Sequence, residues 1–135
     1  LADPLAEAAG ARGAEMTRLG ARPGARTSAL ELLAAFGGPE TGVLAGLMLA
    51  AASTNVPVIL DGYATGAAAL IAAALAPSAA GYLVAAHTGS FTHARILAHL
   101  GLHPMFEVGL GHGEGTGAAM ALALIDHMAA VASQG

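Results

Sequence analysis

Cysteine and lysine are both missing from the chain of 135 residues, and charged residues of any kind make up only 10% of it. Without cysteine there is no disulfide framework and no thiolate metal site, which fits a reducing cytoplasm. The five cationic residues are all arginine, and the formal net charge is −4. This balance argues against nucleic-acid binding through a basic patch.

The sequence also lacks an apolar run long enough to cross a bilayer. Its most apolar stretches, residues 43–52 and 64–76, are alanine-rich and shorter than the roughly 20 residues that a spanning helix needs. The first ten residues contain Asp3 and Glu7 and no cationic start, so no secretory signal is predicted. We expect no membrane partner and a cytoplasmic location. Because the chain has no initiator Met, we expect a fragment or a processed product.

Hydrophobic residues are abundant, at 56% of the chain. A chain of this length can form one domain with a real core, and this composition is far from that of a disordered segment. The apolar fraction exceeds what a small monomer buries comfortably. We therefore predict association, either as a homodimer or with a missing N-terminal half.

The first part of the chain carries signals for helices. Residues 1–27 are interpreted as a weak helix over 5–19 followed by a Gly, Pro and Arg linker, and residues 28–135 as the main α/β part. Ser28 followed by Glu31 has the spacing of a capping box, which predicts a helix to Phe36. Pro39 in a first turn starts a second helix that runs to about Ser53.

Three short apolar runs alternate with further helices. Residues 56–60, 82–86 and 105–108 are β-prone and continuous, as in buried parallel strands, and helices are expected over 64–76, 91–100 and 117–132. The pattern predicts an α/β fold: a three-layer, Rossmann-like parallel sheet with flanking helices, alanine-rich and part of a larger domain.

Polar residues follow each predicted strand. They are Asp61, His87 and Glu114, and ligands in open parallel sheets bind beyond the carboxyl ends of the strands. Asp61 with Gly62 has a second interpretation, as the N-cap turn of the helix that begins near Ala64. Both interpretations stay open.

A glycine-rich segment, Gly111-His112-Gly113-Glu114-Gly115-Thr116-Gly117, is the sharpest local feature. Glycines around a carboxylate let the backbone approach a ligand, and the segment leads into a helix whose amides could bind an anion. It has no lysine and is not a phosphate-binding loop of the Walker type. The alternative is that Glu114 only caps the last helix.

The histidines do not form a metal motif. His87, His93 and His99 are spaced by six residues, which puts them on different faces of a helix, and no zinc-binding H-E-x-x-H pattern occurs. We expect no metal. Met105, Met120 and Met128 are predicted to pack in the core.

These segments together resemble a known family. Residues 33–38, 58–63, 85–87 and 100–104, followed by Gly113-Glu114-Gly115-Thr116-Gly117-Ala118, are similar in order and spacing to the C-terminal part of the nicotinate-nucleotide:dimethylbenzimidazole phosphoribosyltransferases of cobalamin biosynthesis. The G-E-G-T-G-A segment is the specific one. The similarity covers roughly residues 28–133.

The resemblance implies an activity and a site. Such enzymes transfer the phosphoribosyl group of nicotinate mononucleotide to 5,6-dimethylbenzimidazole, which gives α-ribazole 5′-phosphate and nicotinate without a metal or other cofactor. The resemblance assigns Glu114 as the general base on the benzimidazole nitrogen. It places the substrate-binding residues at Asp61, Gly62, His87, Gly113, Gly115 and Thr116.

The sequence departs from the family pattern at two places, and the first departure favours an alternative function. The loop over residues 88–93 is shorter than in the family and has no carboxylate, and the arginine that commonly precedes G-E-G-T-G is replaced in the region of Gly111 and His112. The chain is therefore interpreted as a fragment or subunit of an active enzyme, or alternatively as a non-catalytic ligand-binding or regulatory module derived from the family.

Overall fold

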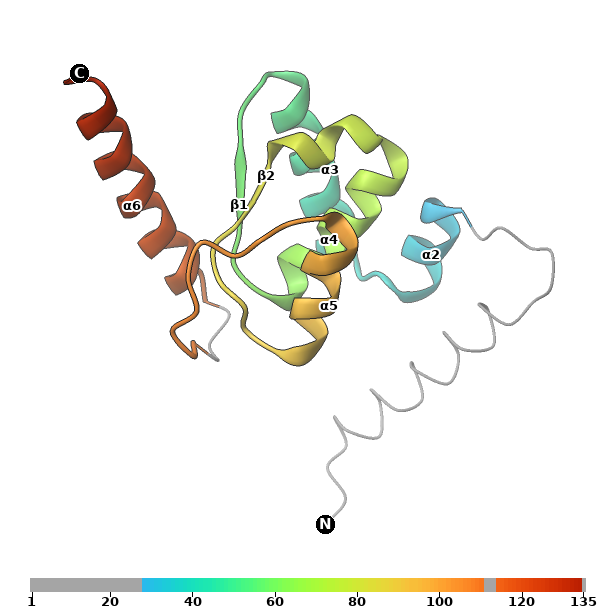
Figure 1. Cartoon of the computed structure of the whole chain (residues 1–135). Helices are drawn as coiled ribbons and strands as arrows, with labels where there is room; N and C mark the ends of the chain where they lie inside the picture. The colour runs from blue at the N-terminus through green and yellow to red at the C-terminus, as the bar shows by residue number, and fades with distance from the viewer. Residues whose placement is uncertain (1–27, 111–113, 135) are drawn as a thin grey trace, which may run out of the picture. The chain divides into compact units, whose positions relative to one another are not determined.

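A computed structural model describes residues 28–110 and 114–134 and divides the chain into two compact units, Leu1–Gly38 and Pro39–Gly135 (Figure 1). In the first unit, α2 spans Ala29–Phe36 and begins with the predicted capping box. The Ser28 hydroxyl accepts a hydrogen bond from the Glu31 amide, and the Glu31 carboxylate accepts one from the Ser28 amide. The helix predicted over 5–19 and the linker over 20–26 lie outside the described residues.

Two helices of the second unit follow the sequence signals closely. Helix α3 spans Pro39–Ser53 and starts with the predicted proline, whose missing N–H costs nothing in the first turn. Helix α4 spans Tyr63–Leu75. Its N-cap is Gly62, and the Thr65 hydroxyl both donates to the Gly62 carbonyl and accepts from the Gly62 amide. The interpretation of Asp61 and Gly62 as the N-cap turn of this helix is confirmed for Gly62, whereas the Asp61 side chain does not cap the helix.

The sheet is parallel, as predicted, but smaller. Strand β1 (Val58–Leu60) pairs in parallel with β2 (Leu83–Ala85), and α4 and a 3-10 helix, η1 (Pro77–Tyr82), connect them. The predicted third strand over 105–108 is instead a single parallel bridge between His87 and Phe106. The segment turns away after two backbone hydrogen bonds to the end of β2, so it is too short to form a ladder.

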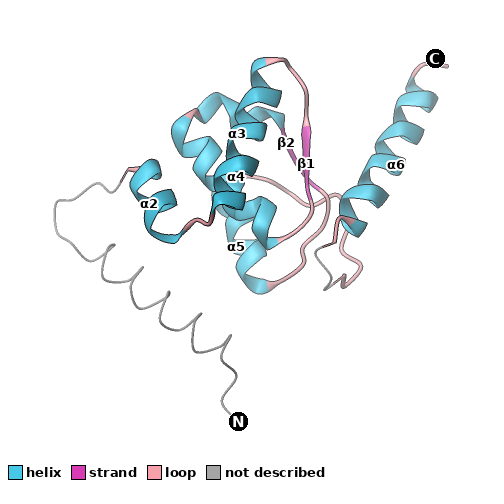
Figure 2. Cartoon of the chain, turned by 180° about the vertical axis from the view of Figure 1, so that it is seen from behind, coloured by secondary structure: helices cyan, strands magenta, loops and turns pink. Residues whose placement is uncertain are grey.

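Helices lie on both sides of this sheet. Figures 1 and 2 show α3, α4 and α5 (Phe91–Leu100) on one side and α6 (Thr116–Ala132) on the other. The three-layer α/β architecture is therefore confirmed. No helix in the described part of the chain is both long and apolar enough to span a bilayer.

Small side chains build the core between the sheet and helices α3 to α5. Alanines occupy the buried positions of α4, and Gly66 lies where an added Cβ would come 3.0 Å from the His93 ring. Because these side chains are short, the helix backbones approach closely. The buried cluster also includes larger apolar residues from each neighbouring element, namely Met48, Leu60, Leu83 and Leu97.

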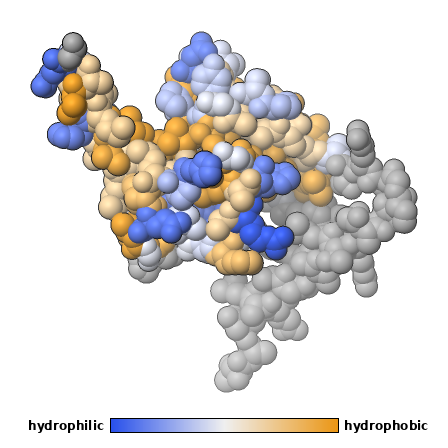
Figure 3. All heavy atoms as spheres, in the orientation of Figure 1, coloured by the Kyte–Doolittle hydropathy of each residue, from blue (hydrophilic) through white to orange (hydrophobic). Residues whose placement is uncertain are grey.

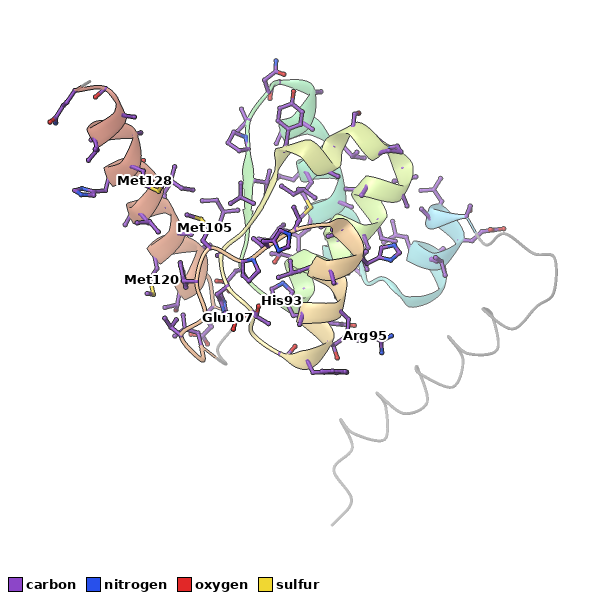
Figure 4. The ribbon with its side chains drawn as sticks, viewed as in Figure 1. His93, Arg95, Met105, Glu107, Met120 and Met128 are labelled. Atoms are coloured by element: carbon purple, nitrogen blue, oxygen red, sulfur yellow. The ribbon has the colours of Figure 1, made fainter. Side chains whose placement is uncertain are left out.

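Helix α6 differs from the others because it is mostly exposed. Only Gly117 and Ala121 are buried in it, whereas Met120 and Met128 are 44% and 58% exposed. The prediction that these methionines pack in the core was wrong. Figure 4 shows them on α6, and Figure 3 shows apolar surface along that helix. Periodicity identifies such an apolar helix but not what covers it.

Candidate functional site

An open pocket of about 500 Å³ lies at the carboxyl edge of the two strands. Residues after β1, residues after β2 and the start of α6 converge there, as expected for an open parallel sheet. Its lining consists of Ile59, Asp61, Gly62, Tyr63, Ala64, Thr65, His87, Gly89, Ser90, Leu110, Gly115 and Ala118. Four of the predicted site residues, Asp61, Gly62, His87 and Gly115, are therefore brought together.

Asp61 connects β1 to the start of α6. Its carboxylate is buried and accepts hydrogen bonds from the backbone amides of Gly115 (3.0 Å) and Ala118 (2.9 Å). These amides belong to the N-cap and third residue of α6, and Gly115, which adopts a φ of 81°, has no side chain that could cap the helix. Asp61 is thus the N-terminal capping group of a helix more than 50 residues away in sequence.

His87 is buried next to Asp61. Its Nε2 atom lies 3.6 Å from the Asp61 Oδ1 atom, and its ring stacks on Phe106 at a centroid distance of 6.3 Å. Neither ring nitrogen of His87 has a hydrogen-bond partner within the described residues. Buried nitrogens without partners are costly, so His87 carries two polar atoms that the described residues leave unsatisfied.

His93 packs edge-on against His87, with ring centroids 6.4 Å apart. Its Nδ1 atom accepts a hydrogen bond from the Gly89 amide (3.3 Å), which ties α5 to the loop after β2. Burial lowers the pKa of His93, the nearby His87 lowers it further, and Asp61 opposes the shift. The described residues contain no group of three side chains suited to holding a metal ion.

Glu114 is not among the residues that line the pocket, but it directly precedes Gly115, which is. The Glu114 side chain is exposed and makes no hydrogen bond with another described residue. The cap of α6 is supplied by Asp61, so the interpretation of Glu114 as the cap of that helix was wrong. Thr116 is the exposed first residue of α6, whereas Gly113 lies outside the described residues.

Sequence reasoning missed two contacts. Glu107 accepts a hydrogen bond from the Thr88 hydroxyl (3.2 Å), so a carboxylate does stand beside the loop over residues 88–93 (Figure 4). Gly117 lies so close to His87 and Asp61 that an added Cβ would overlap the His87 ring. The glycine pattern around Glu114 was the available signal for the second contact. No local signal pairs Thr88 with Glu107.

Comparisons with known proteins point to one family. A family model described as a phosphoribosyltransferase matches residues 11–134. The nicotinate-nucleotide–dimethylbenzimidazole phosphoribosyltransferase of Desulforudis audaxviator is 46% identical over 106 residues, which cover 78% of this chain and 30% of that protein. The enzyme of the same name from Deinococcus radiodurans is 49% identical over 105 residues, covering 77% of this chain and 29% of the relative.

A solved structure is also similar. The crystal structure of the nicotinate-nucleotide–dimethylbenzimidazole phosphoribosyltransferase from Thermus thermophilus aligns with a TM-score of 0.70 and 38% identity. The alignment covers 76% of this chain and 31% of that one. The chain thus spans about 30% of the length of the curated relative from Desulforudis audaxviator.

Proposed function

This chain belongs to the nicotinate-nucleotide:dimethylbenzimidazole phosphoribosyltransferase family, and on that premise we propose that it supplies the general base and part of the substrate pocket for phosphoribosyl transfer. The phosphoribosyl group passes from nicotinate mononucleotide to 5,6-dimethylbenzimidazole, giving α-ribazole 5′-phosphate and nicotinate. The observation that carries the proposal is the pocket at the strand ends, which gathers Asp61, His87 and Gly115 from three separate segments.

Glu114 acts as the general base in this proposal. A benzimidazole nitrogen attacks the anomeric carbon of the ribose as the bond from that carbon to the pyridine nitrogen of nicotinate breaks. The second nitrogen of the azole must lose its proton, and the Glu114 carboxylate accepts it. The leaving ring starts as a pyridinium cation and departs neutral, so it needs no acid. Neither a metal nor another cofactor enters the reaction.

The substrate contacts follow from the pocket. The N-cap residues of α4 and α5, Gly62 and Ser90, border the pocket, and helix N-termini favour anions such as the phosphate of nicotinate mononucleotide. His87 also lines the pocket, and this proposal assigns it to substrate binding. Gly115 lines the pocket next to Glu114 in sequence, and Asp61 lines it from the end of β1. Thr116 is assigned to substrate binding from the resemblance alone. Gly113 is assigned to the same role from the resemblance alone.

The chain acts together with further protein in this proposal. It spans about 30% of the length of its relatives, and the pocket is open. The apolar surface of α6 supports association, either with a second copy or with the remaining part of such an enzyme. The cysteine-free composition fits a cytoplasmic location.

One observation favours the alternative, a binding or regulatory module without turnover. The loop over residues 88–93 is shorter than in the family and contains no carboxylate of its own. Glu107 reaches Thr88 from outside that loop, which gives a carboxylate at the same edge and favours the enzyme.

The test is direct. The purified chain, alone and mixed with the remaining part of a homologous enzyme, is incubated with nicotinate mononucleotide and dimethylbenzimidazole. Chromatography then measures nicotinate and α-ribazole 5′-phosphate in equal amounts if the proposal holds. Binding of nicotinate mononucleotide without either product supports the alternative module. If neither the chain alone nor the mixture binds nicotinate mononucleotide or forms product, both functions are wrong.

A further inference from the structure

We infer that Asp61 is a positioning residue, which holds Glu114 at the edge of the pocket by capping α6 and does not itself bind substrate. We call the two hydrogen bonds from the Asp61 carboxylate to the start of α6 the anchor. The role of Asp61 in catalysis rests on the proposed function, whereas the existence of the anchor does not. Both carboxylate oxygens of Asp61 already accept amide hydrogen bonds, Oδ2 from Gly115 and Oδ1 from Ala118. Each oxygen can still accept a second hydrogen bond, but the Asp61 side chain is only 7% exposed, so a ligand has little access to it.

No side chain at the start of α6 could replace Asp61 as the cap of that helix. The first amides of a helix need acceptors, which a Ser, Thr, Asp or Asn at the N-cap normally provides. Here the N-cap is Gly115, which has no side chain. The Asp61 carboxylate takes that place from β1, and its negative charge also interacts favourably with the positive end of the α6 dipole.

The sheet side of the anchor is fixed as well. Asp61 follows β1 directly, and its backbone amide donates to the Thr65 hydroxyl (3.1 Å). Its side chain is only 7% exposed, with the His87 ring at 3.6 Å on one side. Gly117 lets α6 approach because any Cβ there would overlap that ring and come 2.9 Å from Asp61 Oδ1.

Glu114 depends on this anchor. It is the residue before Gly115, and its own side chain has no hydrogen-bond partner among the described residues. Two hydrogen bonds within the next four residues therefore set where its backbone lies. Removing one of them should let the Glu114 carboxylate sample positions from which it cannot reach the azole proton, since proton transfer requires close alignment.

The first experiment measures the anchor in this chain without any activity. Asp61→Asn keeps the shape and loses one acceptor oxygen. We expect the amides of Gly115 and Ala118 to exchange with solvent about tenfold faster or more, as judged by NMR, while the amides of Leu83 and Ala69 keep their protection. Asp126→Asn, the same change at an exposed position of α6, should alter neither set. Unchanged exchange at Gly115 and Ala118 would overturn the inference.

A second measurement needs no variant, in case Asp61→Asn does not fold. In the unmodified chain, NMR should detect scalar couplings across these two hydrogen bonds, from the amide nitrogens of Gly115 and Ala118 to the side-chain carboxyl carbon of Asp61. If neither coupling is seen while those between β1 and β2 are, the hydrogen bonds from Asp61 to α6 do not exist in solution.

The third experiment tests the link to Glu114 in an assembly that has the activity. If Asp61 acts through Glu114, Asp61→Asn should lower kcat while leaving the KM for nicotinate mononucleotide within about twofold, and the double variant with Glu114→Gln should be no slower than Glu114→Gln alone. Independent, additive losses or a large rise in KM would overturn the positioning role. If the unmodified assembly has no activity, the proposed function fails, and the exchange result still decides whether the anchor exists.

Discussion

Gly117 packs against His87 so closely that even one added methyl group at this position would overlap the imidazole ring. We expect Gly117→Ala to destabilise the second unit by about 1–3 kcal/mol, because the ring is buried and cannot move without disturbing its neighbours. Urea unfolding followed by circular dichroism measures the change. Gly46→Ala is the matched control: an added Cβ meets nothing within 4 Å there, and stability should stay equal or rise by up to about 1 kcal/mol.

Glu114→Gln tests the general base. The variant should lower turnover by about 10² to 10⁴ in an active assembly, since only proton transfer is lost. The thermal midpoint should not change, because the Glu114 side chain is exposed and the cap of α6 comes from Asp61. Full activity in the glutamine variant would end the catalytic assignment.

The stability of the fold should depend on pH through His93. Its imidazole is fully buried, and burial lowers its pKa below the ordinary 6.5, so the folded chain resists protonation while the unfolded chain accepts a proton near 6.5. The unfolded state then binds more protons, and the free energy of unfolding should fall as the pH drops below about 6.5. Above that pH this contribution is constant.

Urea midpoints between pH 5 and 8 measure this dependence. His93→Gln should flatten the slope, since glutamine keeps an acceptor for the Gly89 amide but does not titrate. His99→Gln, on the exposed side of the same helix, should leave the slope as it is. A slope that survives in the His93 variant would mean that another group causes it.

Asn55 adopts a φ of 60°, in the left-handed region, and its side-chain oxygen accepts a hydrogen bond from the Tyr82 hydroxyl. Asn55→Ala should cost about 1–2 kcal/mol, because it loses the hydrogen bond and strains the backbone. Asn55→Gly loses only the hydrogen bond and should cost less. Tyr82→Phe isolates the hydrogen bond in the same thermal unfolding assay, and equal losses in the alanine and glycine variants would argue against backbone strain.

The exposed apolar face of α6 should mediate association. Met120, Leu124, Met128 and Val131 share one side of the helix. Leu124→Glu should raise the dissociation constant of the assembly by about tenfold or more, because it places a charge in an apolar contact. Ala129→Glu places the same charge on the other side of the helix and should have little effect. Sedimentation velocity over a concentration series compares the two variants. If the unmodified chain is a monomer at every concentration and in every mixture, α6 does not mediate association.

The local elements could be predicted from the sequence because their signals are local. The spacing of Ser28 and Glu31 fixed the start of α2, Pro39 fixed the start of α3, and the apolar runs located β1 and β2. The polar residues after the strands were predicted to lie together because the carboxyl ends of parallel strands meet at one edge of the sheet. Their convergence at one pocket is confirmed for Asp61 and His87, while their roles stay predictions.

What could not be predicted depends on contacts between distant residues. A carboxylate before a helix has the same local pattern whether it caps that helix or another one, so Asp61 was assigned to α4 in one interpretation. The segment at 105–108 is β-prone, but only the path of the chain after Phe106 limits it to one bridge. The apolar residues of α6 resemble core residues because periodicity records hydrophobicity and not the presence of a partner.

The bond from Asp61 to Gly115 joins residues 54 positions apart, and this separation bears on the order of folding. Closing a loop of that length costs about 3.5 kcal/mol of chain entropy in its length-dependent part, more than pairing β1 with β2 over a shorter separation. The edge that carries Glu114 should therefore be the last part to form and the first to open. A ligand that contacts only this closed edge would then stabilise the chain as it binds, and its affinity would include the cost of completing the fold.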